Sequence, residues 1–178
     1  MKILAIGDSI TWGYPFGPSD SWVNILNKEI KKDIIINSGI NGQTFYDILK
    51  RIESEINEYN PEIIILTAGI NDAFLDYSLD EINMYINRIV EIVSSYKIKI
   101  IFGIPFEVNI PYIDRKLKNI NNLILKVCEL NAYDYIDFRD KRITFFDECH
   151  PDKEGYKVMA EIVKNKILKL SYVKKIIF

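Results

Sequence analysis

Histidine and cysteine are scarce in this sequence, and their scarcity excludes several classes of protein. The 178 residues include one histidine, His150, and two cysteines, Cys128 and Cys149. Two cysteines cannot build the disulfide framework of a small secreted domain. One histidine and two cysteines also provide no credible set of zinc ligands, so we expect no metal site.

Long apolar runs and an excess of one charge are also missing. Charged or polar residues interrupt every apolar stretch well before the roughly 18 residues of a membrane-spanning helix. The 23 basic and 25 acidic residues leave a net charge of −2, so we expect no nucleic-acid partner. The apolar run at residues 3–6 is too short for the core of a signal peptide, which favours a cytoplasmic location.

The arrangement of apolar residues predicts an α/β fold in which residues 1–178 form one domain. Short isoleucine-rich runs alternate with longer amphipathic stretches, which is typical of βα units on a parallel sheet buried on both faces. We expect strands at residues 2–6, 33–37, 62–67, 99–103 and 133–137. Helices are expected at residues 21–32, 44–59, 79–96, 112–131 and 153–170.

Several local features refine this map. Thr44 with Asp47, and Ser78 with Glu81, place a hydroxyl before a helix and an acid at its third position, which predicts two capped helix starts. Cys128 lies in an apolar helical stretch and is expected in the core. Trp22 is also expected to be buried, and the apolar segment 171–178 is expected to pack or to pair as an edge strand.

Ser9 is a candidate nucleophile because of its place after the first strand. Ligands of an open parallel sheet bind beyond the carboxyl ends of the strands. Ser9 follows Gly7-Asp8 between the first strand and a helix, where backbone N–H groups point toward a bound anion. Taken alone, this segment is better explained as a polar turn.

His150 is the one available general base for a serine nucleophile. Asp147 stands three residues earlier, a spacing at which side chains on a helical turn meet. Alternatively, His150 caps a helix that begins at Pro151. If the strand order is 2-1-3-4-5, three strand spacings of about 4.8 Å separate the two segments. The dozen or so residues after Phe138 reach almost 40 Å at about 3.3 Å each, so this loop is long enough to bring His150 to Ser9.

Donors for an oxyanion are also present after the strands. The natural candidates are the N–H of Ser9, the N–H of Gly39 and the side-chain amide of Asn71, each after a different strand. A glycine turn at Gly39 and Gly42, and an ordinary turn at Asn71, are the alternative explanations.

These weak signals occur together in chain order and resemble the four sequence blocks of the SGNH/GDSL hydrolase family. The matching segments cover nearly the whole chain: Gly7-Asp8-Ser9-Ile10, Gly39, Gly69-Ile70-Asn71-Asp72 and Asp147-x-x-His150. The resemblance implies a flavodoxin-like three-layer α/β/α sandwich with a five-stranded parallel sheet in the order 2-1-3-4-5. It also implies hydrolysis of esters or thioesters without a cofactor, with Ser9, Gly39, Asn71 and His150 as the family's four residues. Ile10 stands where leucine is common, and Glu148 where glycine is common.

The substrate pocket is expected beside Ser9. Asp8, Trp12 and Tyr14 lie in or near the loop after the first strand, and Phe74 and Phe106 lie in the loops after the third and fourth strands. The aromatic residues are expected to form a wall for an acyl or aryl group, although they would equally cover the core.

The sequence therefore predicts a serine esterase or acylhydrolase that cleaves small acyl esters or thioesters through an acyl-enzyme. Ser9, His150 and Asp147 would form the triad. A carbohydrate O-deacetylase and an acyltransferase are alternatives on the same machinery. A non-catalytic flavodoxin-like module that binds an anion after the first strand is a further alternative. Cys149 is disfavoured as a nucleophile, because adjacent side chains such as those of Cys149 and His150 rarely face each other.

Overall fold

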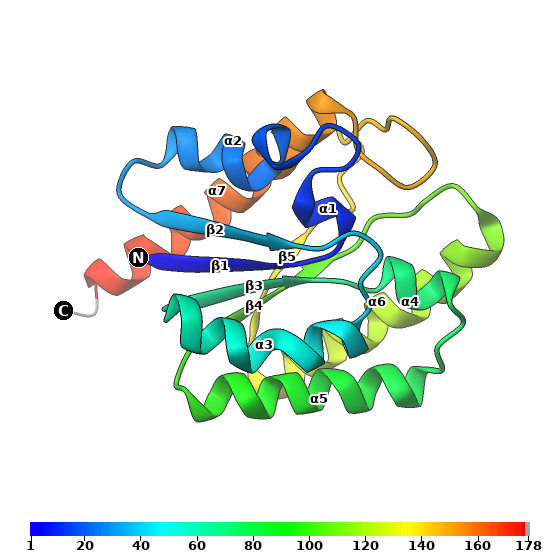
Figure 1. The fold of residues 1–178 in the computed structure, drawn as a ribbon, viewed down its shortest axis with the longest axis horizontal. Helices are drawn as coiled ribbons and strands as arrows, with labels where there is room; N and C mark the ends of the chain where they lie inside the picture. Colours follow the sequence, from blue (N-terminus) through cyan, green and yellow to red (C-terminus); the bar gives the residue numbers. More distant parts are fainter. Residues whose placement is uncertain (177–178) are drawn as a thin grey trace.

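Five parallel strands form the centre of the fold in the order β2-β1-β3-β4-β5 (Figure 1). The computed structural model describes the backbone of residues 1–176 and the side chains of residues 1–170. The strands are β1 (Lys2–Gly7), β2 (Ile34–Gly39), β3 (Ile63–Thr67), β4 (Lys99–Ile104) and β5 (Asp134–Asp137). The strand order implied by the family resemblance is confirmed, and every strand begins and ends within two residues of its predicted position.

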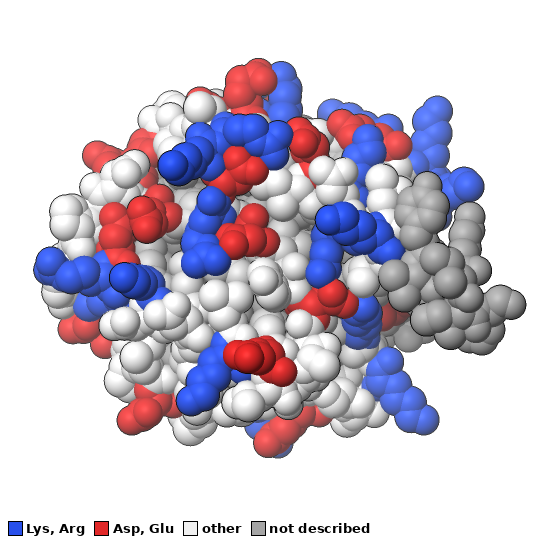
Figure 2. Space-filling model, turned by 180° about the vertical axis from the view of Figure 1, so that it is seen from behind, with Lys and Arg blue, Asp and Glu red and all other residues white. Residues whose placement is uncertain are grey.

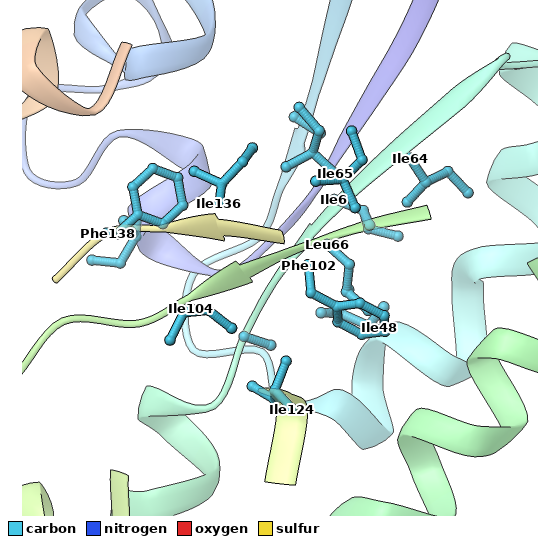
Figure 3. Packing of buried hydrophobic residues seen from close by; sticks show 14 of the residues in the cluster. Ile6, Ile48, Ile64, Ile65, Leu66, Phe102, Ile104, Ile124, Ile136 and Phe138 are labelled. Carbon is cyan, nitrogen blue, oxygen red and sulfur yellow. The ribbon is translucent and has the colours of Figure 1, made fainter. Parts of the chain in front are cut away.

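The central strands are buried on both faces, which explains why they were visible in the sequence. β1, β3 and β4 are buried along almost their whole length. Figure 3 shows Ile65 and Ile136 on one side of the sheet and Leu66 and Phe102 on the other. Because both faces must be apolar, such strands appear as short continuous runs of isoleucine and related residues.

Helices cover both faces of this sheet (Figure 1). On one face α2 (Trp22–Glu29) packs against α7 (Lys153–Ile176). On the other face α3 (Phe45–Tyr59) packs against α5 (Leu79–Ser95), and α5 packs against α6 (Pro111–Asn131). The buried apolar side chains of all three layers belong to one hydrophobic cluster. The architecture is the expected three-layer α/β/α sandwich.

Both predicted capping boxes are present. Thr44 Oγ1 accepts the N–H of Asp47 at the start of α3, and the Asp47 carboxylate accepts the N–H of Thr44 in return. Ser78 and Glu81 make the same reciprocal pair at the start of α5. The expected burial of Trp22 and Cys128 is also confirmed.

Three short helical segments escaped the sequence prediction. They are α1 (Ser9–Trp12), the 3₁₀ segment η1 (Pro18–Asp20) and α4 (Ile70–Phe74). Each has at most five residues, which is too few for an apolar periodicity to develop. Two of them carry candidate site residues, because Ser9 lies in α1 and Asn71 in α4.

The C-terminal helix begins at the predicted residue but extends beyond its predicted end. α7 begins at Lys153, whereas Pro151 forms an isolated bridge with Phe145, so His150 is not the cap of a helix that starts at Pro151. The backbone of residues 171–176 continues α7, so the expectation of an edge strand there is wrong. Adding a residue to an existing helix fixes one residue for one hydrogen bond, whereas a new strand needs a partner edge. Residues 177–178 of that segment lie outside the described residues.

Candidate active site

Ser9 lies at the carboxyl end of β1, where it is the first residue of α1. Asp8 is the N-cap of this helix, and its Oδ1 accepts the N–H of Ile10 at 2.9 Å. Because Gly7 of β1 pairs with Gly39 of β2 in parallel register, the loops after these two strands leave the sheet at the same level. The structure therefore places Ser9 at the edge where ligands bind in parallel sheets.

Ser9 meets His150, although 141 positions separate them in the sequence. Ser9 Oγ lies 3.1 Å from His150 Nε2, a distance that permits proton transfer. The segment between β5 and α7 makes this approach, as its length allowed (Figure 1). The ring of Tyr14 packs on the imidazole with 4.5 Å between the ring centroids.

Asp147 holds the opposite side of the His150 ring. Its Oδ2 and Oδ1 lie 2.9 Å and 3.0 Å from His150 Nδ1. Oδ1 also accepts the backbone N–H groups of Cys149 and His150. Burial acts to raise the pKa of Asp147, but these N–H groups and the imidazole outweigh it and hold the pKa below its ordinary value. Asp147 is thus an ionised acceptor that orients the imidazole.

The expectation of a helical turn between Asp147 and His150 is wrong. These residues lie in a bent loop, in which the N–H of Phe146 donates to the His150 carbonyl at 2.8 Å. The bridge between Phe145 and Pro151 closes the loop. A loop side chain that accepts nearby backbone N–H groups brings the acid to the base as effectively as a helix would.

Asn71 and Gly39, two expected oxyanion donors, have different surroundings. The Nδ2 of Asn71 donates to the Gln43 carbonyl at 3.0 Å and makes a longer contact of 3.4 Å with Asp8 Oδ2. The N–H of Gly39 donates to Asn37 Oδ1 at 2.9 Å. The expectation that Gly39 presents a free donor is therefore at odds with the structure, because a side chain of its own strand already accepts this N–H.

Gly42, the second glycine of the same loop, differs from Gly39 in backbone conformation and in surroundings. Its φ of +79° lies in the region that glycine adopts without strain, and a Cβ added there would meet nothing within 4 Å. The next residue, Gln43, presents its carbonyl to Asn71. The sequence contained both glycines, and the structure distinguishes them by the bond of Gly39 to Asn37 and by the positive φ and open surroundings of Gly42.

Two buried carboxyl groups lie beneath the site. Burial raises the pKa of Asp8 to about 7; the N–H of Ile10 opposes the shift and the nearby Asp72 adds to it. Burial likewise raises the pKa of Asp72 to about 7, although its carboxylate accepts the N–H of Phe45. Asp8 was expected to line the substrate pocket. That expectation is wrong, because Asp8 is buried as a helix cap.

Of the residues predicted to form an aromatic wall, Tyr14 contacts the imidazole of His150. Tyr14 and Phe74 are 39% and 44% exposed, and Trp12 is half-buried. Phe106 is 4% exposed and packs edge-on against Phe145, so the expectation that it lines the pocket is wrong. It follows a central strand so closely that its ring enters the core.

Phe146 is an exposed residue near the site that the sequence did not single out. It is 58% exposed and packs edge-on against Phe16 from the loop after α1. This pair connects the loop after α1 to the segment between β5 and α7 that carries His150.

Cys149 is a poor nucleophile in this position. Burial, with a further contribution from the charge of Asp147, raises the pKa of its thiol to about 11. The reactive form of a cysteine is the thiolate, so a raised pKa makes this side chain less reactive.

Charges of both signs are interspersed over the face shown in Figure 2, which is the side opposite to that of Figure 1. Lys164 and Lys166 of α7 pair with Glu29 and Asp134 at 2.8 Å and 2.6 Å. Among the side chains of residues 1–170, no three histidine, cysteine or acidic residues gather as metal ligands would. No helix within residues 1–176 has the length and apolar character to cross a membrane.

Comparison with known proteins identifies a family. The model of the GDSL-like lipase/acylhydrolase family matches residues 5–158. The arylesterase of Vibrio mimicus is 21% identical over 180 residues, which cover 94% of this chain and 88% of that protein. An uncharacterised lipoprotein, YqeF of Bacillus subtilis (strain 168), is 35% identical over 77 residues, or 40% of this chain and 32% of YqeF. Thioesterase 1/protease 1/lysophospholipase L1 of Escherichia coli (strain K12) is 26% identical over 90 residues, or 50% and 43% of the two chains.

Solved structures show the same fold. A protein assigned to the lipolytic G-D-S-L family from Desulfitobacterium hafniense DCB-2 superimposes with a TM-score of 0.85 at 25% identity, covering 92% of this chain and 98% of that chain. The acetyl xylan esterase AlAXEase gives a TM-score of 0.83 at 20% identity over 94% and 100% of the two chains. Because the family model spans most of the sequence, this chain belongs to the GDSL-like lipase/acylhydrolase family and is a hydrolase that acts on ester bonds.

Proposed function

We propose that this hydrolase is a serine esterase or acylhydrolase in which Ser9 is the nucleophile, His150 the general base and Asp147 the residue that orients the base. The proposal rests on one observation above all: Ser9 Oγ lies 3.1 Å from His150 Nε2, while Asp147 binds Nδ1 on the far side of the ring. A serine hydroxyl gains nucleophilicity from such a base, and the carboxylate stabilises the imidazolium that forms.

The first half of the reaction forms an acyl-enzyme. Ser9 Oγ attacks the carbonyl carbon of the ester, and its proton moves to His150 Nε2. The tetrahedral intermediate then collapses, and the bond to the leaving alcohol or thiol breaks as His150 returns the proton to it. Asp147 remains ionised throughout and holds Nδ1–H.

The second half releases the acid. Water takes the place of the leaving group, His150 accepts one of its protons, and the hydroxide adds to the acyl carbon. Collapse of the second intermediate returns the proton to Ser9 and frees the carboxylic acid. An acyltransferase differs only in that an alcohol replaces water at this step, and we keep it as an alternative.

The oxyanion of each intermediate needs donors that are fixed in advance. The N–H of Ser9 is one, because the first N–H groups of a helix have no partner within it. The Asn71 amide is the second. We expect the oxyanion to replace Asp8 as the acceptor in the longer of its two contacts. For the third we propose the N–H of Gly42 rather than that of Gly39, which Asn37 already accepts.

Small acyl esters or thioesters are the substrate class that we propose. Tyr14 packs on His150, and Phe146 packs on Phe16 nearby, so exposed aromatic side chains are available to an acyl or aryl group. The similar proteins are an arylesterase, a thioesterase/lysophospholipase and an acetyl xylan esterase, a range that includes the alternative of a carbohydrate O-deacetylase. A non-catalytic anion-binding module is set aside, because the family is one of hydrolases.

Organisation and location complete the proposal. We propose that the chain acts as one domain, since side chains of every layer share one hydrophobic cluster. A cytoplasmic location stays a prediction, and the partial relative YqeF, a lipoprotein, offers a different precedent.

A chromogenic ester series tests the function. We expect hydrolysis of p-nitrophenyl esters with short acyl chains, loss of activity in Ser9→Ala, and full activity in Ser95→Ala, whose exposed serine lies at the end of α5. Comparing acetyl to octanoyl esters reports the preferred acyl length. Hydrolysis by Ser9→Ala at the wild-type rate would overturn the assignment of the nucleophile.

A further inference from the structure

Arg51 is an arginine of α3 that is 14% exposed at its side chain and has a partner for every donor. Its Nε donates to Gln43 Oε1 at 2.6 Å. One terminal nitrogen donates to Ser38 Oγ and to Glu55, and the other donates to the carbonyls of Gly7 and Ser38 at 3.2 Å and 2.9 Å. A guanidinium has five N–H groups, and all five are used.

The first group of contacts fixes the ends of two strands. Gly7 is the last residue of β1, next to the nucleophile segment, and Ser38 lies one residue before the end of β2. The Ser38 carbonyl and the Gly39 N–H belong to one planar peptide and point in opposite directions. Arg51 binds the carbonyl and Asn37 binds the N–H, so this peptide is held from both sides.

The second contact fixes the far end of the same loop. Gln43 receives the Nε–H of Arg51 through its side chain, while its backbone carbonyl accepts the amide of Asn71. The loop of residues 38–43 is thus bound by one guanidinium at its start and at its end. This loop carries Gly42 and holds Asn71, the two donors that follow β2 and β3.

The charge of Arg51 is compensated within the same cluster. Glu55, one helical turn further along α3, is 13% exposed at its side chain and binds both Arg51 and the Ser38 hydroxyl. A partly buried ion pair is weak evidence for stability, because desolvation offsets much of its attraction. A gain in stability therefore does not explain why this position holds an arginine. The planar guanidinium explains it, because it can bind several carbonyls at once.

We propose that Arg51 is a positioning residue for the oxyanion site: it fixes the loop of residues 38–43 so that Gly42 and Asn71 face the reacting carbonyl. This inference rests on the proposed function, since it requires an oxyanion beside Ser9. Arg51 itself does not touch the substrate. Its effect is on the transition state, because donors that are fixed in advance stabilise a developing charge that a mobile loop does not.

Arg51→Lys is the decisive variant. Lysine keeps the charge and the pairing with Glu55, but its single ammonium cannot reach Gln43, Ser38 and Gly7 together. We expect kcat to fall by about ten- to a hundredfold with KM within about twofold, the pattern of a contact that matters only in the transition state. Arg88→Lys, on the exposed surface of α5, is the matched control and should leave both constants unchanged.

Two measurements separate positioning from folding. Burst titration with a slowly hydrolysed ester counts the folded, competent sites, so kcat is expressed per site. Gln43→Leu removes only one of the five contacts, at a half-buried loop residue, and should lower kcat several-fold without changing the melting temperature. Wild-type kcat per site in Arg51→Lys, or in a folded Gln43→Leu if the lysine variant does not fold, would overturn the proposal.

A double-variant cycle tests the route of the effect. If Arg51 acts through the oxyanion donors, the factor by which Arg51→Lys lowers kcat should depend on Asn71, because coupled residues are not additive. We expect this factor to be at least about three times smaller in Asn71→Ala than in the wild type. Strictly multiplicative losses would show that Arg51 acts independently of Asn71 and would contradict the proposal. Activity in Ser9→Ala would instead refute the proposed function, so the two failures are distinguishable.

Discussion

The proposed nucleophile, Ser9, and its proposed base, His150, are held in place by different means, although they meet at one point. Ser9 sits on a short, buried connection in which Asp8 caps α1. The end of β2 packs so closely on α1 that a Cβ on Gly39 would lie 2.1 Å from the Trp12 nitrogen. His150 ends a longer segment between β5 and α7, most of which is exposed or half-buried.

Side-chain contacts hold the histidine segment. Arg142 binds Asp140 and reaches Glu161 on α7, and Thr144 donates to Asp152 at 2.7 Å. Each exposed ion pair contributes roughly 0–1 kcal/mol, so no single contact dominates. Main-chain packing therefore sets the position of Ser9, while several weak contacts together set the position of His150. The nucleophile segment should tolerate little change and the histidine segment much more.

The largest effect is expected from removing either partner of the pair. Ser9→Ala and His150→Ala should each lower kcat/KM for a chromogenic ester by about 10⁴-fold or more, because the triad acts as a unit. The double variant should be within about tenfold of the slower single variant. Losses that multiply would mean that the two side chains act separately, despite their 3.1 Å contact.

Asn71→Ala should have the next largest effect. Loss of one oxyanion donor typically lowers kcat by about a hundred- to a thousandfold. KM should change little, because the bond strengthens only as charge develops on the substrate oxygen. Asn87→Ala on the exposed face of α5 provides the control. A rise in KM with an unchanged kcat would show that Asn71 binds the ground state instead.

Gly7→Ala and Arg142→Gln compare the two segments directly. A Cβ on Gly7 would lie 2.3 Å from Thr11 Oγ1 and 2.5 Å from the Thr67 carbonyl, an overpacking that costs roughly 1–3 kcal/mol. At about 2–4 °C per kcal/mol, Gly7→Ala should lower the melting temperature by several degrees. Arg142→Gln loses exposed ion pairs and should shift it by less than about 2 °C. A larger loss of melting temperature in Arg142→Gln than in Gly7→Ala would contradict the claim that the Ser9 segment tolerates less change than the His150 segment.

The buried acid Asp72 should change how the stability of the protein depends on pH. Its pKa of about 7 lies above the ordinary 3.8, so the folded state binds the proton more tightly than the unfolded chain. Stability must then fall as pH rises from about 4 to about 7. Asp72→Asn removes this contribution. The melting temperature of the variant minus that of the wild type should therefore be larger at pH 8 than at pH 5. An equal difference at both values would show that Asp72 ionises freely.

The sequence was sufficient for the fold because its signals are local and repeated. Isoleucine runs marked the strands, and Thr44 with Asp47 marked a helix start that the structure confirms. The family resemblance supplied the strand order. α1 and α4 were missed, because four or five residues are too few to show a helical period.

The sequence predicted which residues belong to the candidate site better than it predicted how their side chains and N–H groups are oriented. Ser9, Asp147 and His150 were nominated from chemistry and chain order, and the structure brings them together. The direction of the Gly39 N–H depends on Asn37, a contact that no motif specifies. The burial of Phe106 likewise depends on the packing of its neighbours, so neighbouring sequence cannot reveal it.

The most direct test of the account is the rate at which a serine-directed phosphonate modifies the protein, with the adduct located by mass spectrometry. In the wild type we predict modification at Ser9. In His150→Ala the rate should fall by about a thousandfold or more. Equal rates in the two proteins, or an adduct on another residue, would contradict the claim that His150 activates Ser9.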